Sequence, residues 1–164
     1  MTDIRVTGLS ELQAFLDQLP SKIEANIMRG ALRAAAKPIK DGAKSLAPVG
    51  EPVDTNKRRY KLYAGALKDS IRISGRIDKR DGKITAAVKA GGKTKGADVF
   101  YAHFIEFGTR PRENNAGVSS RPFMRPALDG QATNAIIAAG EYIKKRLATK
   151  HGLNTAEIEI GIEE

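Results

Sequence analysis

Hydrophobic residues recur with helical spacing in the first third of the chain. One stripe follows an i, i+3, i+4, i+7 pattern and consists of Leu12, Phe15, Leu16 and Leu19. A second repeats every four residues between Lys22 and Lys44 and consists of Ile23, Ile27, Ala31, Ala35, Ile39 and Ala43. Such periodicity predicts two helices with buried faces. Capping boxes place their starts at Ser10 and Ser21, and Pro38 is expected to kink or interrupt the second helix.

The middle of the chain changes to an alternating pattern. Polar and apolar residues alternate over 70–74 and again over 84–90, with the turn signal Asp81-Gly82 between them, which predicts an antiparallel hairpin. A long apolar stripe then predicts a last helix from about Pro126 to Lys150. The expected fold is α+β: a small antiparallel sheet packed with an N-terminal helix, a long Ala-rich helix and a long C-terminal helix.

The 164 residues are expected to form a single domain over 1–164. Glycine, proline and polar residues predict flexible loops at about 49–61, 91–98 and 112–120. The tail, 153–164, alternates isoleucine with glutamate and is interpreted as an edge strand. An exposed edge strand of this kind is a candidate for pairing with another chain.

Charge adds information about partners. The net charge is +9, and residues 57–125 hold seventeen Lys or Arg against six Asp or Glu. A basic centre suits nucleic acid or an acidic partner surface, and a solubilising charged face is an equally good interpretation. The candidate DNA-facing or partner-facing residues are Lys57, Arg58, Arg59, Lys93 and Lys95. The absence of cysteine fits a reducing compartment.

Candidate chemistry is sparse. His103 and Glu106 are three positions apart, but one histidine and one acid make neither a zinc site nor a catalytic triad. Gly92-Lys93-Thr94 fails as a phosphate loop, because Ala87 stands where the pattern requires its first glycine. We therefore expect no enzyme activity, cofactor or metal. No apolar run reaches the length of a membrane span, and the start lacks the plan of a signal peptide.

The stretch from Tyr101 to Leu128 combines aromatic residues, arginines and prolines. Tyr101, Phe104 and Phe107 predict a short, well-buried segment, after which Gly108 supplies a turn and Thr109 a local cap. Pro122 and Pro126 are expected to delay the last helix until the second proline, with Phe123 filling the core.

Glu106 is an acid inside this aromatic run. A buried carboxylate without a partner is costly, so we expect an arginine to pair with it, from this chain or a neighbouring copy.

Five motifs in order carry a family resemblance. They are Gly8–Leu12, Ala47-Pro48, Gly65–Ile71, the pair Tyr101-Ala102 with Glu106–Thr109, and Pro122–Ala127. Their order resembles the phage neck and tail-completion family that includes the lambda-type minor tail protein Z. The chain departs from the family pattern in a longer polar insert, Arg112–Ser120, and in its acidic tail.

The resemblance implies a non-enzymatic virion protein at the head–tail junction of a long-tailed phage or prophage, assembled in the cytoplasm of the bacterial host. It implies a homo-oligomeric ring that completes the tail and meets the head-closure and tail-terminator proteins. The implied assembly motif consists of Tyr101, Glu106, Phe107, Gly108, Thr109, Pro122, Phe123, Arg125 and Pro126. Two alternatives are a tail-terminator ring and a small basic protein that binds nucleic acid without regard to sequence.

Overall fold

The computed structural model describes residues 5–19, 21–50, 63–77, 83–95, 97–113, 116–151, 160 and 162–163. Its contacts divide the chain into two compact units. The first unit comprises Met1–Pro38, Ser74–Ala87 and Gln131–Glu164, and the second comprises Ile39–Ile73 and Val88–Gly130. The prediction of a single domain stays a prediction.

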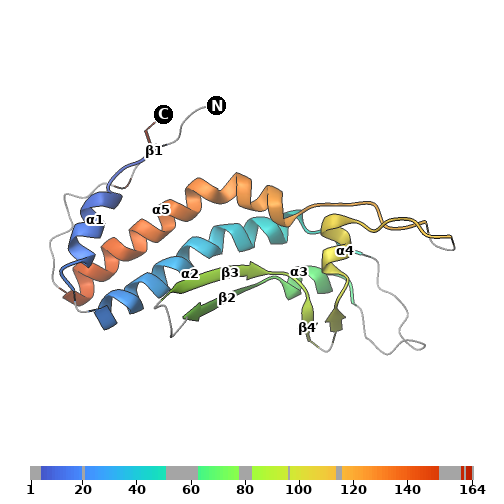
Figure 1. Cartoon of the computed structure of the whole chain (residues 1–164), viewed down its shortest axis with the longest axis horizontal. Coiled ribbons are helices and arrows are strands. Elements are labelled where there is room, and N and C mark those ends of the chain that lie inside the picture. Colours follow the sequence, from blue (N-terminus) through green and yellow to red (C-terminus); the bar gives the residue numbers. More distant parts are fainter. Residues whose placement is uncertain are drawn as a thin grey trace. The chain divides into compact units, whose positions relative to one another are not determined.

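The helices and strands confirm an α+β fold (Figure 1). The helices are α1 (Leu9–Leu16), α2 (Ser21–Leu46), α3 (Ala66–Ser70), α4 (Ala102–Phe107) and α5 (Met124–His151). The strands are β1 (Arg5–Val6), β2 (Arg72–Ile77), β3 (Ile84–Lys89), β4 (Gly92–Thr94), β5 (Ala97–Val99) and β6 (Ile162–Glu163). The N-terminal, Ala-rich and C-terminal helices correspond to α1, α2 and α5.

The described strands form three two-stranded sheets instead of one small sheet, pairing β1 with β6, β2 with β3, and β4 with β5. Strands β2 and β3 run in opposite directions (Figure 1). The ladder ends after β3 because Gly91 and Gly92 have φ angles of 97° and 84°. This left-handed backbone turns the chain away and is open chiefly to glycine.

Side chains from three helices build the core of the first unit. That core consists of Leu12 and Leu16 from α1, Ile27 and Ala31 from α2, and Ile143 and Leu147 from α5. Gly30 lets α2 approach α5 closely, because a Cβ at this position would overlap the Tyr142 ring. The apolar stripes predicted for α1 and for this part of α2 are therefore the faces that pack, whereas the predicted stripe of α5 packs only in part, since its Ile136 is 43% exposed.

The helix starts differ from the prediction. Gly8, with a φ of 82°, precedes α1, and no side chain caps this end. Ser10 lies inside the helix, where its hydroxyl donates to the Glu11 carboxylate at 3.2 Å. Helix α2 begins at Ser21 itself and continues through Pro38 to Leu46 without interruption. A capping box at Ser10 is therefore wrong, because the helix starts one residue earlier.

Small side chains dominate the core of the second unit. Six alanines are buried there, namely Ala43, Ala47, Ala66, Ala97, Ala102 and Ala127. Phe123, which is 1% exposed, is the largest fully buried side chain among the described residues. Alanines let helices and strands approach closely, and one large ring fills the remaining space. The prediction that Phe123 fills the core is confirmed.

A set of hydrogen bonds made by Ser70 and Arg72, which we call the polar lock, joins α3 to the β4–β5 pair. Ser70 is 1% exposed; its hydroxyl donates to the Leu67 carbonyl at 2.7 Å and accepts from the Gly91 N–H at 2.9 Å. The Arg72 guanidinium donates to the carbonyls of Ser70 and Gly91. A Cβ on Gly91 would lie 2.9 Å from the Val99 carbonyl oxygen, so a larger residue would open this lock.

The predicted loops have different outcomes. Residues 91–98 are not a loop throughout, because β4 and β5 pair there with Lys93 opposite Asp98 and Thr94 opposite Ala97. In the stretch 49–61, residues from 51 onward lie outside the described residues. In 112–120, a β-bridge joins Val118 to Thr109.

The end of the predicted edge strand forms β6. It pairs antiparallel with β1, with Ile162 opposite Val6 and Glu163 opposite Arg5. Residues 153–159 of the tail lie outside the described residues.

Candidate functional site

Helix α4 ends at a glycine turn. The Gly108 N–H donates to the Phe104 carbonyl at 2.8 Å, and Gly108 has a φ of 73°. A Cβ there would lie 2.8 Å from the Val118 carbonyl oxygen. Both the left-handed backbone and the close approach require glycine, which confirms the turn predicted at this position.

Beyond the turn the chain leaves and returns as two adjacent extended segments, which we call the arm (residues 109–121, of which 114 and 115 are not described; Figure 1). The Thr109 N–H donates to the Val118 carbonyl at 2.9 Å, and the Val118 N–H donates to the Thr109 hydroxyl at 2.8 Å. Thr109 was predicted as a local cap, but its hydroxyl joins the two segments of the arm.

The returning segment closes against α4. The Ser120 hydroxyl donates to the Glu106 carbonyl and the Arg121 N–H donates to the Ile105 carbonyl, both at 2.8 Å. The last carbonyls of a helix lack partners within the helix. The base of the arm supplies partners for two of them.

The Glu106 side chain caps the start of α5. One carboxylate oxygen accepts from the N–H groups of Phe123 and Met124 at 2.8 and 3.0 Å, and the other accepts from Arg125 N–H at 3.2 Å. The first four N–H groups of a helix have no partner within it, and the fourth position here is Pro126, which has none to offer. Glu106 and Pro126 therefore account for all four positions.

Glu106 stays ionised although it is only 8% exposed. Burial acts to raise its pKa, but the N–H groups of Met124, Phe123 and Arg125, together with the Arg125 charge, outweigh burial and lower the pKa below its ordinary value. Hydrogen bonds to the charged form have this effect.

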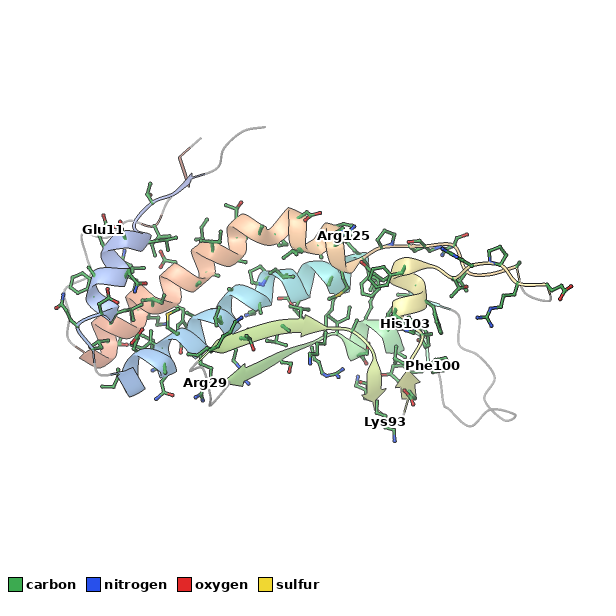
Figure 2. The ribbon with its side chains drawn as sticks, in the orientation of Figure 1. Glu11, Arg29, Lys93, Phe100, His103 and Arg125 are labelled. Atoms are coloured by element: carbon green, nitrogen blue, oxygen red, sulfur yellow. The ribbon has the colours of Figure 1, made fainter. Side chains whose placement is uncertain are left out.

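The expected arginine side chain from this chain does not pair with the acid, so that part of the prediction is wrong; an arginine from a neighbouring copy stays a prediction. Glu106 binds backbone N–H groups, and Arg125 (labelled in Figure 2) contributes its own N–H and its charge. The physical reason is the partial positive charge at a helix N-terminus. Because the carboxylate replaces the missing partners, α5 begins at Met124 instead of waiting for Pro126.

The aromatic segment is less buried than predicted. Ala102 and Glu106 face inward, whereas Phe107 is 74% exposed. The six residues of α4 make only about one and a half turns, so one face packs and the other meets solvent. His103 (Figure 2) lies on the exposed side, where Nδ1 is 3.2 Å from the Phe100 carbonyl oxygen. The His103 side chain therefore faces solvent, whereas the Glu106 carboxylate is buried.

An apolar groove of about 660 Å³ opens in the second unit beside α4. Its lining includes Val49, Tyr63, Phe100, Tyr101, Ile105 and Val118. Val49, Phe100 and Val118 are 58%, 56% and 48% exposed, so the groove presents apolar surface to solvent. Contiguous exposed apolar surface often marks a binding site. Sequence reasoning missed the groove because its walls come from segments distant in the chain.

Of the five predicted basic residues, the structure describes Lys93 and Lys95. Lys93 on β4 is exposed, while Lys95 forms an ion pair with Asp69 at 2.6 Å. The hydrogen bonds from Lys95 and then Tyr63 lower the pKa of Asp69, and the bond to Asp69 raises the pKa of Lys95. Lys57, Arg58 and Arg59 lie outside the described residues.

The described residues offer neither a metal site nor a membrane span. No three His, Asp or Glu side chains among them are placed to hold a metal ion. No helix in the described part of the chain is long and apolar enough to cross a membrane.

Comparison with known proteins identifies the family. No curated protein and no solved structure matches the chain. Residues 10–108 match the family model HK97-gp10_like, described as bacteriophage HK97-gp10, a tail component. The match runs from α1 to the glycine turn after α4, and the arm and α5 lie beyond it. It confirms the predicted relationship to phage tail-completion proteins. The chain therefore belongs to the HK97-gp10-like family of bacteriophage tail components.

Proposed function

We propose that this tail component acts at the head–tail junction, where it completes the tail and joins it to the capsid. The observation that carries the proposal is the corner where α4, the arm and the start of α5 meet. Glu106 fixes this corner through three backbone hydrogen bonds. A surface held by a buried carboxylate keeps its shape when a partner docks, which lowers the entropy lost on assembly.

The proposed contact surface combines the exposed Phe107 with the groove that contains Phe100. Aromatic residues are enriched at protein interfaces because they bury much area and lose little conformational entropy. Phe107 and Phe100 are 74% and 56% exposed, so docking removes a large apolar area from water. We propose that neighbouring neck and tail proteins bind here.

We further propose that copies of the chain form a ring. A ring needs two different surfaces on each copy, so that one surface of each subunit meets the other surface of the next. The tip of the arm (residues 110–113) and the groove, whose wall includes Val118 of the same copy, offer such a pair within the second unit. Contact between the tip of one copy and the groove of the next would repeat in one direction, and it forms a ring where the rotation between neighbours closes.

Deleting the gene tests the role in the phage. We expect tails that accumulate without joining heads, and wild-type protein supplied from a plasmid should restore joining. Phe107→Ser should restore it poorly, because the variant loses apolar contact area. Leu9→Ser on α1 is the matched control, since Leu9 is also an exposed apolar residue but lies outside the corner. Complete tails that join heads normally in the deletion strain would contradict the proposal.

A second experiment tests contact with the DNA path. We propose that Lys57, Arg58, Arg59 and Lys93 face DNA or a partner, and contact with phosphates needs no sequence recognition. Reversing Lys57, Arg58 and Arg59 to glutamate should reduce the fraction of DNA-filled particles. Unchanged infectivity would show that these charges only face solvent.

A further inference from the structure

Helix α2 carries three cations on one side, which we call the basic stripe: Arg29, Arg33 and Lys37. All three are exposed and lie in the first unit; Arg29 is labelled in Figure 2. At 100° per residue they fall within about 80° of one another around the helix. Ile27 and Ala31, which pack in the core, lie outside that sector. The stripe is therefore a separate, solvent-facing surface of α2.

Among the described residues, no acid forms an ion pair with the stripe. The ion pairs of this part of the chain are Lys40–Asp41 and Lys95–Asp69. Glu24, the one acid of α2 in the first unit, lies about 180° around the helix from Arg33. Asp41 stands four positions after Lys37, but its carboxylate is 3.2 Å from the Lys40 ammonium.

The arrangement works against the stability of α2 itself. Arg29 and Arg33 are four positions apart, as are Arg33 and Lys37, and like charges at this spacing destabilise a helix. Exposed helix faces more often mix both signs, which gives stabilising pairs. A negatively charged partner that binds along the stripe would remove the repulsion.

The spacing fits a regular polyanion. A rise of 1.5 Å per residue spreads the three cations over about 12 Å of helix, a length over which one strand of duplex DNA presents about three to four phosphates. A Cβ placed on Gly75 of β2 would lie 3.9 Å from the Arg33 Nε, so the strand beside the stripe carries no side chain at this point. Arginine binds phosphate through two parallel N–H groups.

We infer that the basic stripe binds the sugar–phosphate backbone of duplex DNA without reading its sequence. An acidic protein surface is the less suitable partner, because the centres of protein interfaces are apolar and depleted in lysine, whereas the exposed side chains of this stripe are three cations. The net charge of successive chain segments does not reveal the stripe, because residues 1–56 hold equal numbers of acidic and basic residues. Binding to duplex DNA is inferred from the stripe alone. The further statement that the bound duplex is phage DNA rests on the proposed function.

Duplex binding by the purified full-length protein tests the inference. A fluorescein-labelled duplex of random sequence is titrated at about 50 to 200 mM salt, and anisotropy reports binding. The test variant combines Arg29→Gln, Arg33→Gln and Lys37→Gln. The control combines Arg110→Gln, Arg112→Gln and Lys145→Gln, which removes the same residue types and the same charge from exposed positions on the arm and α5.

We expect the wild-type affinity to fall with salt. The stripe variant should lose about tenfold or more in affinity, and its log–log salt slope should be shallower by about 2 to 3, since each phosphate contact contributes about 0.9. The control should keep most of the slope. Equal losses in both variants, no binding by the wild type at the lowest salt, or equal competition by polyglutamate would each overturn the inference.

Two controls separate folding and phage function from binding. Circular dichroism should give the same helix content for both triple variants; if the stripe variant is unfolded, the single changes Arg29→Gln and Lys37→Gln should each reduce the slope by about 1. Normal head joining in the gene-deletion strain would contradict the proposed function without affecting duplex binding. Absence of duplex binding would overturn the stripe inference and leave the tail role intact.

Discussion

The two units of this protein are specified in different ways. The first is built by large aliphatic side chains at helical spacing, such as Leu12, Ile143 and Leu147. The second surrounds one phenylalanine with alanines and contains Ser70 and Glu106, the two buried polar residues of the described chain. Substitutions of similar volume are tolerated in apolar cores, whereas a buried polar group depends on particular partners. The first unit therefore depends on a pattern, and the second on individual residues.

Glycines sharpen the contrast. Of the described glycines with positive φ, Gly8 lies in the first unit and Gly65, Gly91, Gly92, Gly108 and Gly117 lie in the second. At Gly117 a Cβ would approach the Thr109 carbonyl oxygen to 2.5 Å. The groove and the arm thus belong to the unit in which the backbone conformation requires glycine at more positions.

The largest effect is expected at Phe123. Phe123→Ala should lower the free energy of unfolding by about 3 to 5 kcal/mol, since it leaves a cavity among alanines that are too short to fill it. Urea denaturation measures the loss. Leu147→Met in the first unit is the comparison and should cost less than about 1.5 kcal/mol. If Leu147→Met costs as much as Phe123→Ala, the contrast between the units fails.

Glu106 comes next. Glu106→Ala removes the acceptor of three N–H groups and should destabilise the protein by about 1 to 3 kcal/mol. Glu106→Gln keeps one acceptor oxygen and should cost less, and we expect it to weaken assembly more than solubility. Chemical denaturation and head-joining assays measure the two effects. Normal assembly by Glu106→Gln would show that the carboxylate charge is not needed there.

The same residue predicts a pH dependence. The folded pKa of Glu106 is lower than the unfolded value, near 4.5, so the unfolded chain takes up the proton first as the solution is acidified. The contribution of Glu106 is complete above the unfolded pKa and is lost as pH falls through the folded pKa. Unfolding followed from pH 7 to pH 3, at about one-unit steps, should show a smaller acid-induced loss in Glu106→Gln than in wild type.

A glycine pair gives a third comparison. Gly108→Ala should destabilise by about 1 to 3 kcal/mol, because it forces a side chain into a left-handed backbone. Gly130→Ala in α5 is the control, since Gly130 is helical and a Cβ added there would meet nothing within 4 Å. Alanine at this position should stabilise by up to about 1 kcal/mol. Thermal melts of both variants measure these effects. We expect the melting temperature to fall in Gly108→Ala and to rise in Gly130→Ala.

The smallest effect is expected at Asp69. Partial burial and the hydrogen bond to Asp69 raise the pKa of Tyr63. Asp69→Asn should bring this pKa back toward its ordinary value, which an ultraviolet titration of the tyrosines would detect. The melting temperature should barely change, because exposed ion pairs contribute little. A large loss of stability would show that the Lys95–Asp69 pair holds the hairpin in place.

Sequence reasoning predicted what depends on local periodicity. The apolar stripes of α1 and α2 were predicted because residues three and four positions apart share a helix face. The start of α5 was missed because its cap, Glu106, stands 18 positions before Met124. The β4–β5 pair was missed because Gly91 and Gly92 resemble a linker in composition, although their positive φ angles lead into a hairpin. The basic stripe becomes visible only when charges are placed around the helix.

The closed base of the arm bears on how this protein can evolve. Hydrogen bonds from Thr109, Ser120 and Arg121 hold the two ends of the arm together. The entropy of closing a loop grows slowly with length, by about 0.6 kcal/mol per doubling, so residues can be added beyond the closure at low cost. The polar insert predicted at Arg112–Ser120 lies largely in that region. Changes in tail partner can therefore accumulate at the tip while the corner keeps its shape.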